Sequence, residues 1–187
     1  DNNTAVGYYA LLANTTGTEN VAVGTVALDA QTTSSYNVAL GYNAGGANTA
    51  DHNTFLGRYA GAATTTGANN VVAGSGALAT NTTGDDNTAI GKGALNANTT
   101  ASNNTAVGRD ALVANTTGAS NTAVGAYALD ANTTGSDNAA FGHGALGQNT
   151  TASNNSAFGH LALTANTTGT SNVAVGYAAL DANTTGA

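Results

Sequence analysis

The stretch Asn3-Thr4-Ala5-Val6-Gly7 decides the fold, because close copies of it return through the whole sequence. Eleven copies start at a constant spacing, that of Asn3 to Asn20, except that the step from Asn37 to Asn53 is one residue shorter. A fixed period of this length is typical of stacked repeat folds. We therefore number the positions of each unit from its first Asn. The units begin at Asn3, Asn20, Asn37, Asn53, Asn70, Asn87, Asn104, Asn121, Asn138, Asn155 and Asn172.

The repeat covers residues 1–187, so we predict a single repeat array. Neither end resembles the polar cap of a solenoid, and we expect a fragment of a longer chain. Val, Leu, Ile and Phe together number only 29, a composition that is also found in disordered chains. Disorder does not require apolar residues at one phase of every unit. The pattern instead predicts a thin core spread along a rod.

The charge content narrows the classes of partner. Lys and Arg number three and Asp and Glu ten, which gives a net charge of −7. Binding to nucleic acid requires clustered basic residues, so we expect no nucleic acid partner. The sequence has no Cys and no apolar run long enough to span a bilayer, and we expect neither a thiolate metal site nor membrane insertion in this segment. A surface of Asn, Thr, Ser and Gly suits an extracellular location on a cell or virion.

Each unit is predicted to form one coil. Positions 2 to 4 alternate as a short strand does, and the invariant Gly at position 5 indicates a bend or a close backbone approach. Positions 7 to 11 are expected to form a second short strand, and Asn-Thr-Thr-Gly at positions 12 to 15 is typical of a turn. The fold class is therefore all-β, a parallel β-solenoid of eleven 17-residue coils. At about 4.8 Å per coil the rod is about 50 Å long.

Several positions are expected to be structural. Stacking places the Asn of position 1, as in Asn3 and Asn121, in a ladder of side-chain amides, and position 12 forms a second ladder. The Gly of position 5 is expected to be required by the backbone. We predict that Val at position 4 and Leu at position 9 fill the core, and that Ala at positions 3 and 8 contacts neighbouring chains in a homo-oligomeric fibre. A monomeric solenoid with surface Ala is the alternative. The structural residues named are Gly7, Gly24, Gly125, Ala10, Ala128, Asn3 and Asn121.

The units resemble a known family of repeats. Asn20-Val21-Ala22-Val23-Gly24 and the corresponding 172–176 are similar to the YadA-like head repeat of trimeric autotransporter adhesins. That resemblance implies a left-handed parallel β-roll with three chains per fibre. Residues 121–135 also resemble repeat arrays of bacterial surface and phage tail-fibre-like proteins, which often precede a self-cleaving chaperone domain. The spacing of the units, that of Asn3 to Asn20, is longer than YadA-like heads commonly show.

Binding residues are expected where the repeat varies. Position 6 follows the invariant Gly and holds all three basic residues, two of the three His and three of the seven Tyr. Aromatic and Arg side chains are favoured at recognition surfaces, so this stripe is the candidate for contact with a host-surface protein or glycan. The alternative is a bend, exposed or between chains, that tolerates bulky residues. The candidate residues are Tyr8, Tyr42, Arg58, Lys92, Arg109, His143, His160 and Tyr177.

Other chemistry has weaker signals. His143 and His160 occupy one phase of adjacent coils and could bind a transition metal or respond to pH, but no acidic residue or Cys accompanies them in phase. No pair of carboxylates stands out for glycoside cleavage, and we expect no enzymatic activity, metal or cofactor. Thr at positions 13 and 14 could form an ice-binding face, although adjacent strand residues point to opposite sides. Asn14-Thr15-Thr16 and its repeats match the N-glycosylation pattern, by accident in a bacterial or phage protein.

These observations predict a non-enzymatic fibre or shaft segment of a surface adhesin or tail-fibre-like protein. Such a segment mediates attachment or holds a binding tip away from a surface, and its partner is itself, in a homotrimer or a larger fibre assembly. The alternative is a ligand-specific β-solenoid that binds ice or carbohydrate.

Overall fold

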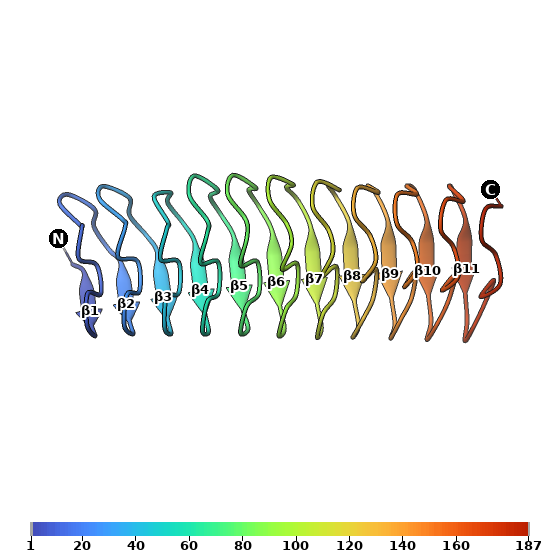
Figure 1. The fold of residues 1–187 in the computed structure, drawn as a ribbon, viewed down its shortest axis with the longest axis horizontal. Coiled ribbons are helices and arrows are strands. Elements are labelled where there is room, and N and C mark those ends of the chain that lie inside the picture. Colours follow the sequence, from blue (N-terminus) through green and yellow to red (C-terminus); the bar gives the residue numbers. More distant parts are fainter. Residues whose placement is uncertain (1, 187) are drawn as a thin grey trace.

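The computed structural model describes residues 2–186 as one row of stacked coils, each with a single three-residue strand (Figure 1). All eleven strands form one parallel sheet, in which each strand pairs with the strand before it and the strand after it. This confirms the parallel β-solenoid. The strands are β1 (Thr4–Val6), β2 (Val21–Val23), β3 (Val38–Leu40), β4 (Thr54–Leu56), β5 (Val71–Ala73), β6 (Thr88–Ile90), β7 (Thr105–Val107), β8 (Thr122–Val124), β9 (Ala139–Phe141), β10 (Ser156–Phe158) and β11 (Val173–Val175).

The register keeps equal positions together, so that Thr105 pairs with Thr122 and Val107 with Val124. The shorter unit that starts at Asn37 does not disturb it, because Val38 still pairs with Thr54. That unit reads Asn48-Thr49-Ala50, without the second Thr, so the turn absorbs the deletion. Within residues 2–186, no helix is long and apolar enough to cross a membrane.

The prediction of a second strand in each coil is wrong. Positions 6 to 11 form a run of turns, and only one strand occurs in each coil of the described chain. The backbone takes positive φ at positions 7 and 9, for example 58° at Tyr127 and 52° at Leu129. These left-handed residues cancel the alternation of a strand, so the neighbours Ala128 and Leu129 both point inward and are fully buried. The apolar sequence of positions 7 to 11 is typical of a strand, but the positive φ angles at positions 7 and 9 are not.

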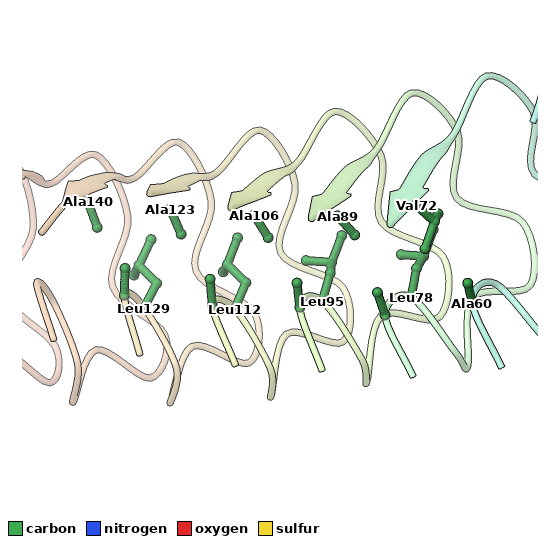
Figure 2. Close-up of a cluster of buried hydrophobic side chains, with 14 of the residues drawn as sticks. Ala60, Val72, Leu78, Ala89, Leu95, Ala106, Leu112, Ala123, Leu129 and Ala140 are labelled. Carbon is green, nitrogen blue, oxygen red and sulfur yellow. The ribbon is translucent and has the colours of Figure 1, made fainter. Parts of the chain in front are cut away.

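The core lies between the wall of strands and the wall of turns. In Figure 2, Ala89, Ala106 and Ala123 point from the strands toward Leu95 and Leu112 on the opposite wall. The prediction that Leu at position 9 fills the core is confirmed. The prediction for the other columns was wrong, because Ala at positions 3 and 8 is buried inside the single chain, and position 4 faces outward. Val6 is 59% exposed and Leu40 51%. The coil is too thin for two large side chains to meet, so Leu faces Ala.

The Gly of position 5 is required for two reasons. Its φ lies between 129° and 149° in all eleven coils, a region that residues with a side chain rarely adopt. A Cβ on Gly125 would also stand 2.5 Å from the carbonyl oxygen of Gly142 in the next coil. The prediction of a close backbone approach is therefore confirmed, for Gly7 and Gly24 as well as Gly125.

The two predicted amide ladders are present. The backbone N–H of Asn138 donates to Oδ1 of Asn121 at 3.0 Å, and the Asn132 amide donates to Oδ1 of Asn115 at 2.9 Å. The side-chain amides of Asn121 and Asn132 also converge on one acceptor, the carbonyl oxygen of Gly135, at 2.8 and 2.9 Å. Buried polar groups are costly unless they are hydrogen-bonded, and the amides of one coil satisfy those of the next; the second ladder runs from Asn81 to Asn183, and Asn14 and Thr64 outside it each have an unpaired side-chain oxygen.

One irregular segment shows how tightly the core is matched. Leu at position 9 is replaced by Gly45 and Gly61, and Phe55 occupies position 3, where nine coils have Ala and one has Val72. A Cβ on Gly45 would lie 2.5 Å from the Phe55 ring, and one on Gly61 would also collide with that ring. Phe55 is fully buried, and its ring lies against Gly45 and Gly61, where other coils have leucine.

We predict that Phe55→Ala lowers the free energy of unfolding by about 3–5 kcal/mol, because its own coil and the coil before it both lack the leucine that could fill the cavity. Adding Gly45→Leu and Gly61→Leu restores the regular Ala–Leu arrangement and should recover most of the loss. Urea unfolding gives the free energy of unfolding of the natural protein, of Phe55→Ala and of the triple variant. The packing argument would be wrong if the triple variant were no more stable than Phe55→Ala.

Candidate recognition stripe and sheet face

The position-6 side chains form the recognition stripe predicted above, and the structure aligns them along one edge of the sheet. At its carboxyl-terminal end the rings stack in series. The ring centroids of His143 and His160 are 5.2 Å apart, and those of His160 and Tyr177 are 5.3 Å apart. Tyr127, at position 7, meets His143 edge to face at 5.7 Å. The predicted adjacency of the two His is confirmed.

The remaining members of the stripe form smaller groups. Tyr42 and Tyr59 meet edge to face at 5.2 Å, and the Arg58 guanidinium lies 4.4 Å from the centre of the Tyr59 ring. Arg109 lies 5.4 Å from the centre of the Tyr127 ring. Tyr8 stacks on Tyr9 at 3.9 Å, and its pKa is raised mainly by a hydrogen bond to Tyr9. Lys92 is exposed, without a long side chain at position 6 of the coil before it.

The stripe presents aromatic rings and the side chains of Arg58, Lys92 and Arg109, and Tyr and Arg are residue types that are enriched at recognition surfaces. Within residues 2–186 no three His, Cys, Asp or Glu lie close enough to hold a metal ion, and no pocket is found there. His143 and His160 are therefore two possible ligands without a third from the described chain.

The sheet face consists of the outward residues of positions 2 and 4, which sequence reasoning had placed partly in the core. Every one of these residues is uncharged over all eleven strands. Large apolar side chains are exposed on it, including Phe158 at 41% and Val175 at 72%, and the rings of Phe141 and Phe158 stack at 4.9 Å. The alternation of positions 2, 3 and 4 predicted that the strands have two faces, but it did not show that the face with positions 2 and 4 lies on the surface.

A second aromatic pair was also overlooked. Tyr36 and His52 occupy position 17 and its equivalent in the short unit, and their rings stack at 4.8 Å with planes only 1° apart. The signal was available in the sequence, because the two residues hold the same phase in adjacent coils.

Two surface possibilities raised by the sequence are altered by the hydrogen bonds. The Thr hydroxyls of position 13 donate to carbonyl oxygens of the next coil, as Thr116 does to Thr133 at 3.0 Å, so they do not form a free face. The Asn of the glycosylation pattern is fully buried in the interior coils, for example Asn98, whose side-chain amide donates to the carbonyl oxygen of Ala101, while Asn14 in the first coil is half-buried. Such an amide is not accessible in the folded chain.

Asp130 carries the one shifted carboxyl pKa on the turn side of the described chain. Burial raises its pKa above 3.8 because desolvation penalises the ionised form. The backbone N–H groups of Asp130 and Ala131 lower the pKa in part, Asp110 raises it further, and His143 lowers it.

No family model, curated protein or solved structure matches this chain.

We predict that Asp130→Asn stabilises the protein at pH 7 but not at pH 3. The folded pKa lies above the unfolded value, so the stability of the natural protein falls as pH rises from 3.8 through the folded pKa. The Asn variant does not ionise and escapes this loss. Urea unfolding of both proteins at pH 3 and pH 7 measures the difference. An equal difference in stability at both pH values would contradict the prediction.

Proposed function

We propose that this chain is a non-enzymatic segment of an extracellular fibre, in which several copies, three in the favoured arrangement, associate through the sheet face. The segment holds a binding tip away from a cell or virion surface, or contributes to attachment. The observation that supports this is the exposed, uncharged sheet face, which runs without interruption from β1 to β11.

The composition of the face favours a second copy of the chain as its partner. With a net charge of −7, copies repel one another wherever their charged surfaces meet. Positions 2 and 4 carry none of that charge, so copies can approach there without the penalty. Apolar patches of several hundred Å² on soluble proteins mark interaction sites.

The size of the face is adequate. Eleven coils at about 4.8 Å and two outward residues per strand give a strip of about 50 Å by about 10–15 Å. That is on the order of 600 Å² before side chains are counted, and a standard interface buries about 800 Å² per partner. The turn side of the coil offers no comparable strip, because Asp29, Asp110 and Asp130 interrupt it.

We predict a solution mass near three times 18.0 kDa by light scattering. Val107→Lys with Val124→Lys, on the sheet face, should reduce the mass to that of a single chain, because six buried ammonium groups would be left without partners. Val26→Lys with Val113→Lys is the matched control. It adds the same charge on the turn side and should leave the mass unchanged. A monomeric natural protein, or equal behaviour of both variants, would overturn the proposal.

A ligand-specific module is the second candidate, and one observation favours it. Thr88, Thr105 and Thr122 lie in register on the sheet face, with Ile90, Val107 and Val124 beside them. This is a regular array of hydroxyl and methyl groups, about 4.8 Å apart along the rod and about 7 Å across it. Thermal hysteresis distinguishes the candidates. A monomer that halts ice growth favours the array, and an oligomer without this activity favours the fibre.

A further inference from the structure

The sheet face has two charged borders. The exposed residues alternate across each coil at positions 17, 2, 4 and 6, as in Asp86, Thr88, Ile90 and Lys92, while Asn87 and Ala89 between them are buried. Position 17 is the last residue before the Asn that opens the next coil, so it borders the start of the following strand. Each row thus begins at the entrance of a strand and ends just after the Gly bend.

The two borders carry opposite charge. The acidic edge consists of positions 16 and 17, at the start of the strands, and holds Glu19, Asp51, Asp85, Asp86 and Asp137. The basic edge is position 6, at the end of the strands, and holds Arg58, Lys92 and Arg109, together with the histidines His143 and His160; a third histidine, His52, lies on the acidic edge. No acidic residue occurs on the basic edge, and no Lys or Arg on the acidic edge.

The charges also coincide strand by strand. β4 has Asp51 before it and Arg58 after it. β6 lies between Asp85-Asp86 and Lys92, and β9 lies between Asp137 and His143. β5 and β8 have no charge at either border, since Ala68, Asn69 and Ser75 flank the first and Ala119, Ser120 and Ala126 the second.

One basic residue, Arg109, has no acidic residue at the start of its own strand. Arg109 follows β7, whose start carries Ser102 and Asn103, and Arg109 instead forms an ion pair with Asp110 in its own chain at 3.0 Å. Glu19 before β2 and His160 after β10 stand without a counterpart at the same strand.

These borders cannot pair within one chain. Five residues, among them the whole of strand β6, lie between Asp86 and Lys92, and no ion pair joins these two side chains. Among residues 2–186, Arg109–Asp110 is the sole ion pair. The complementary charges of β4 and β6 are therefore available to another molecule that presents the same spacing.

We propose that copies of this chain associate in parallel and without axial stagger about an axis along the rod, so that the basic edge of one copy meets the acidic edge of the next at the same strand. This inference rests on the proposed association through the sheet face and adds its direction and register. A shift of one coil would place Lys92 opposite Asn69 or Asn103. An antiparallel pair would bring like edges together, which is unfavourable.

The single lysine of the chain provides a direct test. A carbodiimide joins an amine to a carboxylate only where the two touch. In a mixture of ¹⁵N-labelled and unlabelled chains we expect links between Lys92 of one chain and Asp85 or Asp86 of another, identified by mass spectrometry. Lys92→Arg should abolish them. Links from Lys92 to Asp51 or Asp137, or an oligomer with no link between chains at Lys92, would overturn the register.

Charge exchange tests the same contact energetically. Lys92→Asp alone should weaken association roughly tenfold, since each copy loses an ion pair and gains a repulsion. Asp86→Lys with Lys92→Asp restores opposite charges at β6 and should recover most of the affinity. Asp137→Lys with Lys92→Asp has the same net charge but leaves acidic residues at both borders of β6, and should not recover.

Light scattering of the natural protein separates the two proposals. If the natural protein is an oligomer and the two double variants dissociate equally, the proposed register is wrong, but the association through the sheet face is not contradicted. A monomeric natural protein overturns both.

Discussion

The hydrogen bonding of each coil to the next is the interaction on which the rest of the structure depends. Thr122 N–H donates to Asn138 at 2.8 Å in one direction along the rod, and Gly125 N–H donates to Val107 at 2.8 Å in the other. Coils at this separation leave no space for a side chain between them at the bend, which requires Gly125 and its equivalents. The buried Asn amides solve the remaining problem, because they satisfy carbonyl groups such as that of Gly135 that the turn leaves without a backbone partner.

Thinness is the second constraint. The strand wall and the turn wall are close enough that Leu112 reaches Ala106 and nothing larger is needed, as Figure 2 shows. Leucines at position 9 hold φ between 47° and 55°, a conformation that costs roughly 1–2 kcal/mol for a residue with a side chain. Burial of the leucine contributes about 1.5–3 kcal/mol, enough to offset that cost. Where Phe55 fills the core from the strand wall, the leucines are replaced by Gly45 and Gly61, which adopt positive φ without strain.

Because the core is closed by small residues, the larger apolar residues of positions 2 and 4 remain outside. An exposed surface without a partner would be expected to carry charged residues on at least some of its eleven strands. Positions 2 and 4 carry none. At the borders of this face, acidic residues lie before the strands and Arg58, Lys92 and Arg109 lie after them, while Asp29, Asp110, Asp130 and Asp181 lie on the turn side. A neutral strip with opposite borders is a surface suited to a second copy of itself, and the position-6 stripe then belongs to the border of that contact as much as to any receptor.

The sequence by itself determined the repeat, the parallel stack, the Gly at position 5, the Asn ladders, the Leu core and the alignment of His143 with His160. All of these follow from period and phase, since equal positions of identical coils must lie side by side. Period could not show which face of the strand is inside. The alternation of Ala123 and Val124 is equally compatible with either residue facing the core. Only the closure of the coil, which leaves room for Ala but not Val opposite Leu129, decides that Val124 lies outside. Nor could composition reveal that positions 6 to 11 are turns, because the left-handed φ of Tyr127 and Leu129 is imposed by stacking against neighbouring coils. The tertiary structure therefore decided which surface is free to bind, and that choice transfers the candidate contact from the Ala columns to the uncharged sheet face.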